Sequence, residues 1–133
     1  MRALLLLTLL LPPGCVTVSP PCVGAARPQL RAELIFGRSI KGGDVVSEAA
    51  WRRFLDEEVT PRFPDGFTVI DGRGQWRGEG QTKIVKEASK VLVVAMPGGA
   101  ERRARLAAVA EAYKRRFRQE SVATLLTPSC VSF

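Results

Sequence analysis

The pattern of apolar and polar positions predicts four β-strands. Residues 31–38 alternate between the two classes, as expected for a strand with one buried face. Residues 82–96 form a longer strand whose second half, 91–96, is apolar at every position, which indicates burial on both faces and a central place in a sheet. The two remaining strands are predicted at residues 67–70, continued irregularly to Trp76, and at residues 122–126.

Two segments carry apolar residues at helical spacing and are predicted to be helices. Ser47 can cap the first helix by accepting a hydrogen bond from a free backbone N–H, and Pro61 is expected to end it. The second helix is expected to run from Ala100 to Gln119. The apolar stripes consist of Trp51, Phe54, Leu55 and Val59 in the first helix and of Leu106, Val109, Ala110, Tyr113 and Phe117 in the second.

The resulting order, β-α-β-β-α-β, predicts an α+β domain of the ferredoxin-like type, which is an antiparallel sheet with two helices on one face. Because the first and last strands of this plait are neighbours, Cys22 and Cys130 are expected to lie close enough for a disulfide. Since helices cover only one face, Val91, Val93 and Ala95, or the residues alternating with them, would leave an apolar patch. A homodimer is one way to cover such a patch.

The first fourteen residues are predicted to be a signal peptide. Met1–Leu11 has one positive charge followed by an apolar run that is too short to span a bilayer. Residues 15–30 are rich in Pro, Ser, Val and Ala, and we expect them to be a tether. Residues 31–133 then form a single domain.

Two cleavage sites fit this leader. In the first, Gly14 precedes Cys15, whose thiol would carry lipid, and the protein would be a lipoprotein of the cell envelope that faces the periplasm. In the second, cleavage after Ala26 would give a soluble periplasmic or secreted protein and leave Cys130 alone. We favour the first site because it leaves Cys22 and Cys130 as an even pair in an oxidising compartment.

The composition excludes several classes of function. The net charge is +7 and histidine is absent, so a serine–histidine triad is excluded. The sequence shows no metal-ligand spacing and no phosphate loop, and we therefore predict neither a metal nor a cofactor. The basic excess favours contact with anionic surfaces, or it reflects solvated helix faces. RNA-recognition modules share this strand order, but the third strand lacks the aromatic residues on which bases stack, so no nucleic acid is expected.

Only the segment Thr60–Gly78 has a composition that indicates more than packing, because prolines, glycines, arginines and aspartates surround a short apolar strand. Arg62, Arg73 and Arg77 would form an anion clamp, since guanidinium binds carboxylate or phosphate in a bidentate way. The alternative is an internal ion pair, such as Arg62 with Asp65 or with a glutamate of the first helix.

The same segment contains acidic and aromatic candidates. A partly buried carboxylate would serve as a base, and an aromatic ring beside an amide would form a platform for an organic ligand. The alternative is that the aspartates cap their own turns and that the tryptophan covers the core. The candidate ligand-binding residues are Arg62, Asp65, Asp71, Gln75, Trp76, Arg77 and Glu87. No catalytic residue is assigned.

Three separated motifs resemble a known family. The motifs are Thr60–Gly66 (TPRFPDG), Gly74–Arg77 (GQWR) and Cys130–Phe133 (CVSF). From about Ala32 to Phe133 the chain resembles an uncharacterised bacterial family, domain of unknown function 3574. The resemblance implies a small exported protein, often with a lipoprotein-type leader, and it carries no established activity or catalytic residues.

Together these observations predict an exported, lipid-anchored domain that binds an envelope partner or a small ligand without catalysis. The alternative is a small dimeric α+β enzyme that acts on an organic substrate at Thr60–Gly78. An enzyme should gather Arg62, Asp71, Trp76 and Glu87 around one concave pocket, whereas an interaction module should show them scattered or paired internally.

Overall fold

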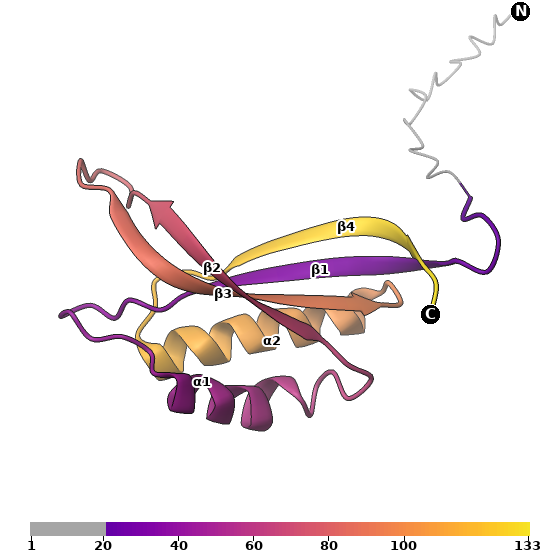
Figure 1. Ribbon diagram of the computed structural model, residues 1–133, viewed down its shortest axis with the longest axis horizontal. Coiled ribbons are helices and arrows are strands. Elements are labelled where there is room, and N and C mark those ends of the chain that lie inside the picture. The colour runs from indigo at the N-terminus through magenta and orange to yellow at the C-terminus, as the bar shows by residue number, and fades with distance from the viewer. Residues whose placement is uncertain (1–20) are drawn as a thin grey trace, which may run out of the picture.

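The computed structural model describes residues 21–133, so the predicted signal peptide, Cys15 and the first part of the tether lie outside the described residues. The elements are β1 (Arg27–Gly37), α1 (Glu48–Phe54), η1 (Leu55–Val59), β2 (Thr68–Trp76), β3 (Val85–Met96), α2 (Ala100–Phe117) and β4 (Ala123–Val131) (Figure 1). The predicted order of strands and helices is confirmed, with the π-helical turn η1 added after α1.

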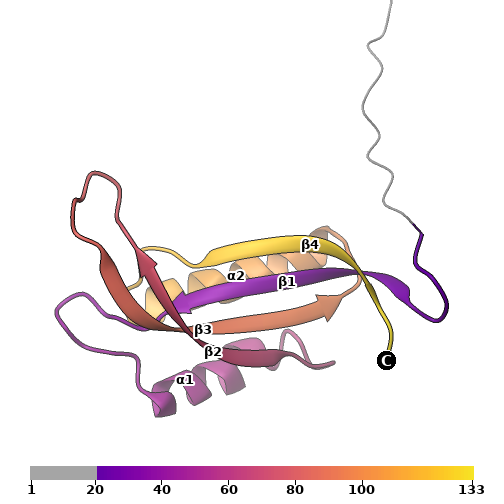
Figure 2. The ribbon, with the colours of Figure 1, turned by 45° about the horizontal axis from the view of Figure 1, so that its top comes forward.

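The four strands form one antiparallel sheet in the order β2-β3-β1-β4. Both helices lie on the same side of this sheet, and Figures 1 and 2 show them behind or below the strands. This is the predicted ferredoxin-like plait. The apolar strand β3 is central, as the continuous run at residues 91–96 indicated. Burial on both faces is not found, because Val91 and Val93 are only half-buried and Ala95 is exposed on the side away from the helices.

The first and last strands of the chain, β1 and β4, extend further than the sequence predicted. β1 begins at Arg27, inside the predicted tether, because it pairs there with Val131 at the end of β4. β4 continues past residue 126 and includes Pro128, which an edge strand tolerates because one side of its ladder needs no partner. β3 begins at Val85 rather than at residue 82, so the hairpin loop is longer than predicted.

The first helix begins as predicted but ends differently. The Ser47 hydroxyl accepts a hydrogen bond from the Ala50 N–H at 3.1 Å, which confirms the cap. The last turn before Pro61 is π-helical, with the Thr60 N–H donating to the Leu55 carbonyl at 2.8 Å. This wider turn leaves Val59 fully buried. The second helix ends at Phe117 rather than at residue 119.

The core lies between the helices and the face of the sheet that they cover. Phe36 of β1 contacts Trp51, Phe54 and Tyr113 edge-on, with ring centroids 5.2, 6.0 and 4.7 Å away. The Tyr113 hydroxyl donates a hydrogen bond to the Gly37 carbonyl at 2.8 Å, and burial raises the pKa of Tyr113 far above its usual value. Among the residues that the structure describes, every buried core residue lies between Leu30 and Phe117.

A disulfide joins Cys22 to Cys130, as predicted from the strand order. It links the entry of β1 to the end of β4 across 108 positions of sequence. Between residues 21 and 133, no helix combines the length and the apolar character that crossing a membrane requires.

Candidate functional site

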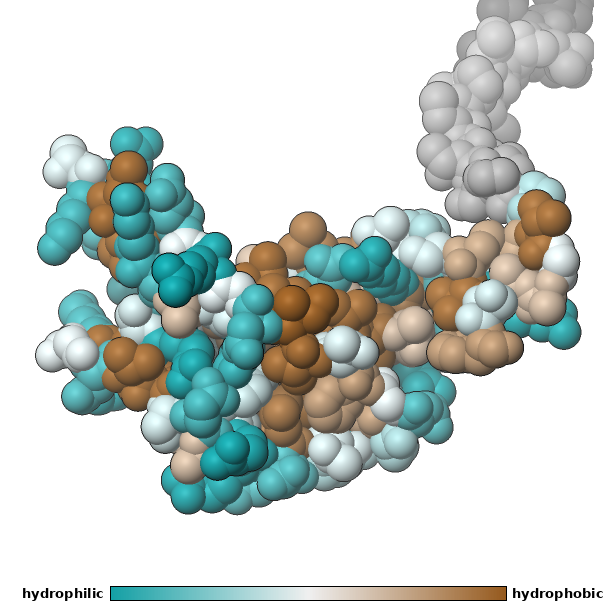
Figure 3. Space-filling model, viewed as in Figure 1, coloured by the Kyte–Doolittle hydropathy of each residue, from teal (hydrophilic) through white to brown (hydrophobic). Residues whose placement is uncertain are grey.

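The face of the sheet opposite the helices, here called the open face, carries apolar side chains on all four strands. Figure 3, which views the sheet obliquely, shows apolar residues gathered in the middle of the domain. The strand register aligns Ile70, Val91, Ile35 and Ala123 in one row and Thr68, Val93, Glu33 and Leu125 in the next. Ile70 and Leu125 are 51% and 48% exposed. The sequence predicted this patch from Val91, Val93 and Ala95, and all three lie on the open face.

Beyond the end of β1, strands β2 and β3 continue as a two-stranded arm, residues 73–88. β1 ends at Gly37, which pairs with Ser89, so residues 85–88 of β3 pair with β2 and with no strand on their other side. Figures 1 and 2 show the arm rising from the sheet on the side away from the helices. The arm therefore borders the open face at one end.

The carboxylate of Glu87 is held at the base of this arm. It accepts a hydrogen bond from the Trp76 indole N–H at 2.6 Å and another from the Ser39 backbone N–H at 2.9 Å. Gly37 leaves the room for it, because a Cβ at that position would lie 2.6 Å from a Glu87 carboxylate oxygen. Glu87 and Trp76 are on the open face, and their bond fixes the carboxylate between the arm and the loop that follows β1.

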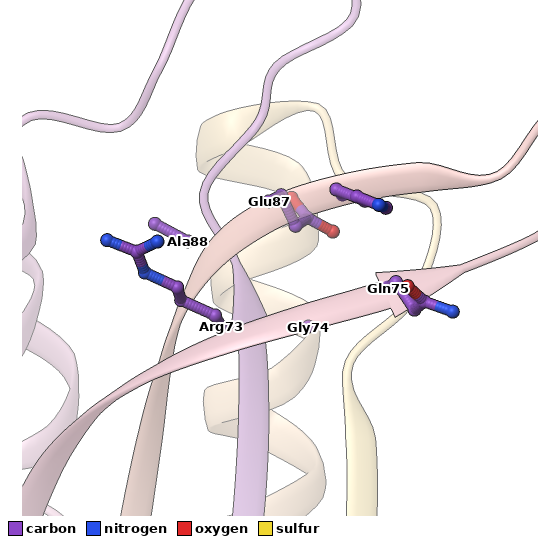
Figure 4. A pocket seen from close by; sticks show the side chains of 6 residues that line it. Arg73, Gly74, Gln75, Glu87 and Ala88 are labelled. Atoms are coloured by element: carbon purple, nitrogen blue, oxygen red, sulfur yellow. The ribbon is translucent and has the colours of Figure 1, made fainter.

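A shallow hollow of about 500 Å³ lies along the arm. It is lined by Arg73, Gly74, Gln75, Lys86, Glu87 and Ala88 (Figure 4). Because side chains alternate along a strand, Arg73 and Gln75 belong to the opposite face of the arm from Trp76 and Glu87. The sequence placed Gln75 and Trp76 in one platform, whereas in the structure they belong to opposite faces of β2 and both border a small hollow near the tip of the arm.

Arg62 and Asp65 lie apart from the arm. The Arg62 guanidinium donates to the carboxylate and the carbonyl of Glu58, at 2.8 and 2.6 Å. This is the internal pair with a glutamate of the first helical segment that the sequence offered as an alternative to an anion clamp. Asp65 is highly exposed, and its nearest cation is Arg102 at 4.0 Å.

Asp71 is used in an ion cluster on the covered side of the sheet. Its carboxylate lies 2.5 Å from the ammonium group of Lys90, which also contacts Glu48 at 3.0 Å. Burial by itself would lower the pKa of Lys90, but the hydrogen bonds to Asp71 and Glu48 outweigh burial and raise that pKa. The Lys90 hydrogen bond in turn lowers the pKa of Glu48, with Arg38 acting in the same direction. The cluster ties the start of α1 to β2 and β3.

Arg77 lies near the tip of the arm. It lines a second, smaller hollow of about 250 Å³ with Gln75, Trp76 and Ile84. The three arginines of the predicted clamp are therefore not gathered, because Arg62 is paired with Glu58 and Arg73 and Arg77 border different hollows. In the part of the chain that the structure describes, no group of three Cys, Asp or Glu side chains is placed to hold a metal ion.

Comparison with known proteins places the chain in a family. Residues 31–133 match the family described as "Protein of unknown function (DUF3574)". The chain belongs to this family. A comparison of the DUF3574 chain with the curated proteins gives no match.

Solved structures share the fold of this DUF3574 protein at low identity. A phage SAM lyase in complex with S-methyl-5'-thioadenosine matches with a TM-score of 0.61 and 14% identity, over 84% of this chain and 88% of that chain. The same type of enzyme in its apo state gives a TM-score of 0.59 at 14% identity, over 84% and 87% of the two chains. CutA from Synechococcus elongatus gives 0.48 at 13% identity, over 77% and 78%. At these identities the likeness is one of fold.

Two features of the site were not found from the sequence. Lys90 is nearly fully buried. The sequence could have indicated this, because the alternation along β3 places this lysine on the side that faces the core. Ser39 donates its backbone N–H to Glu87 from a loop far away in the sequence. A backbone donor carries no residue-type signal, so the fold was needed to reveal it.

Proposed function

We propose that this DUF3574 protein is an exported domain, anchored by lipid at Cys15, that binds an envelope partner or small ligand through its open face without catalysis. The observation that carries the proposal is the apolar row Ile70, Val91, Ile35 and Ala123 on a sheet face that neither helix covers, extended by Val93 and Leu125 in the next row. Apolar patches of this kind on otherwise polar surfaces commonly mark binding sites. A disulfide between Cys22 and Cys130 is typical of an oxidising compartment and supports export.

Noncatalytic binding is favoured over catalysis because the candidate groups are dispersed. Arg62 is paired with Glu58, and Asp71 is paired with Lys90. Of the four residues that an enzyme should gather, only Trp76 and Glu87 lie together, and the indole N–H of Trp76 donates its hydrogen bond to the Glu87 carboxylate. This is the arrangement expected of an interaction module.

Leu125 and Leu126 allow a matched test of the open face. They are neighbours on β4 with similar exposure, 48% and 42%, but they belong to opposite faces of the sheet. A photo-cross-linking amino acid at position 125 should capture a partner in the envelope, whereas the same group at position 126 should capture much less. The mass of the product distinguishes a second copy of this chain from another molecule. Equal capture at both positions, or none at either, would contradict binding through the open face.

A second candidate is an enzyme that acts on a sulfonium nucleoside. It is supported by the Glu87 carboxylate, which two N–H donors orient beside a tryptophan, and by the phage SAM lyase fold. Incubation of the mature chain with S-adenosylmethionine, followed by mass spectrometry, separates the two candidates. The binding proposal predicts no product above the level seen with Glu87→Gln, and a product that depends on Glu87 would replace the proposal with an enzyme.

A further inference from the structure

The arm carries apolar side chains among unpaired cations. Trp76 and Ile84 are 42% and 51% exposed, and they line the small hollow near the tip. Residues 73–88 contain four basic residues, Arg73, Arg77, Lys83 and Lys86. None of the four has an acidic partner within 4.0 Å among residues 21–133.

The acidic residues of the arm do not cancel this charge. Glu79 and Glu87 are its two acidic residues, and the Glu87 carboxylate is already occupied by two N–H donors. The arm stands out from the body of the domain, with apolar residues enclosed by polar ones in the space-filling view (Figure 3). An anionic surface can therefore reach it without displacing any other element.

We infer that the tip of the arm docks on an anionic phospholipid surface. Tryptophan and isoleucine enter the interface between headgroups and acyl chains, where amphipathic rings are favoured. Arg77 and Lys83 flank them in the loop and attract anionic headgroups, as juxtamembrane basic residues do. A soluble polyanion would satisfy the cations but would offer nothing to Trp76 and Ile84, and this favours a lipid surface.

The anchor proposed at Cys15 is consistent with this contact but is not required for it. Five residues separate Cys15 from Pro21, so the two positions lie at most about 20 Å apart. A lipid at Cys15 would keep the domain beside the same surface, and a second weak contact strengthens such anchoring. The inference is independent of binding at the open face and is tested with protein that carries no lipid.

The experiment uses the mature chain, residues 15–133, with Cys15→Ser. Sedimentation with vesicles of phosphatidylcholine, with and without phosphatidylglycerol, measures binding. We expect binding that requires phosphatidylglycerol and weakens as salt rises. Neutralising two tip cations in Arg77→Gln/Lys83→Gln should weaken it by about thirtyfold, at the usual contribution of a basic residue near an anionic membrane.

Arg52 and Arg53 provide the control. Both are exposed on α1, neither forms an ion pair among the described residues, and Arg52→Gln/Arg53→Gln removes the same charge. We expect this variant to lose about twofold or less, because its charges lie away from the tip. An equal loss in both double variants would show general charge attraction and would overturn the inference.

Tryptophan fluorescence tests insertion separately. With Trp51→Phe, Trp76 is the single remaining tryptophan, because the chain has two. Its emission should shift to the blue with phosphatidylglycerol vesicles and should not shift with heparin, a soluble polyanion. Ile84→Ser should weaken vesicle binding while leaving heparin binding unchanged. If Ile84→Ser weakened neither kind of binding, or if vesicles and heparin gave the same emission shift, the arm would bind polyanions in general and the inference of a lipid surface would be rejected.

Discussion

Replacing Trp51 with alanine is expected to lower the free energy of unfolding by about 3 to 5 kcal/mol. The side chain is 2% exposed and lies in the aromatic cluster that joins α1 to the sheet. Its ring centroid is 5.2 Å from that of Phe36, 5.6 Å from that of Phe54 and 5.9 Å from that of Tyr113. Alanine would leave a cavity that these rings cannot fill without moving from their packed positions.

Urea unfolding followed by circular dichroism measures this loss. The neighbouring Arg52 is exposed on the same helix, so Arg52→Ala should change stability by about 0.5 kcal/mol or less. A Trp51→Ala protein as stable as Arg52→Ala would mean that α1 does not pack on the sheet through this residue.

Removing the disulfide is the second change with a large expected effect. The double variant Cys22→Ser/Cys130→Ser should lose about 2 to 5 kcal/mol of stability, because the bridge closes a long loop and restricts the unfolded chain. The bridge spans 108 positions of sequence, which places the expected loss toward the upper end of that range in the chain-entropy account. It also holds the end of edge strand β4 beside β1, so the loss should be accompanied by faster amide exchange in β4.

Cys15→Ser is the matched control for this variant, since it removes a cysteine that is not part of the bridge. Its unfolding curve should coincide with that of the unlipidated wild-type chain. If the double variant were also unchanged, or if reductant left the wild type as stable as before, the bridge would make no contribution to folding.

The order of strands and helices could be predicted because each element has its own local sequence signal. The continuous apolar run in β3 identified a central strand, and Ser47 identified a helix start that its hydroxyl does cap. The Cys22–Cys130 bridge was predicted from the strand order together with the pairing of the cysteines, and it is present in the structure. The end of β4 could not be predicted, because Pro128 indicates a strand break unless the strand is known to lie at the edge of the sheet.

The candidate site was harder to predict because its side chains come from different strands and are brought into contact only when the sheet forms. The sequence singled out Thr60–Gly78 as the segment of the site, and the structure adds that Trp76 of this segment contacts Glu87 on the neighbouring strand. Sequence proximity was misleading for Gln75, since consecutive strand residues project to opposite faces. It was equally uninformative for Asp71, whose partner Lys90 lies across the hairpin on the neighbouring strand.

The central claim is that the protein is an exported domain, held by lipid at Cys15 and closed by a disulfide. The most direct test is the intact mass of the mature protein from membrane and soluble fractions, measured with and without reduction. The account predicts membrane-associated protein that begins at Cys15 with a diacylglyceryl group and that gains the mass of two hydrogen atoms on reduction. A soluble product beginning at Arg27 would contradict it, because Cys22 would be lost with the leader and Cys130 would be a free thiol.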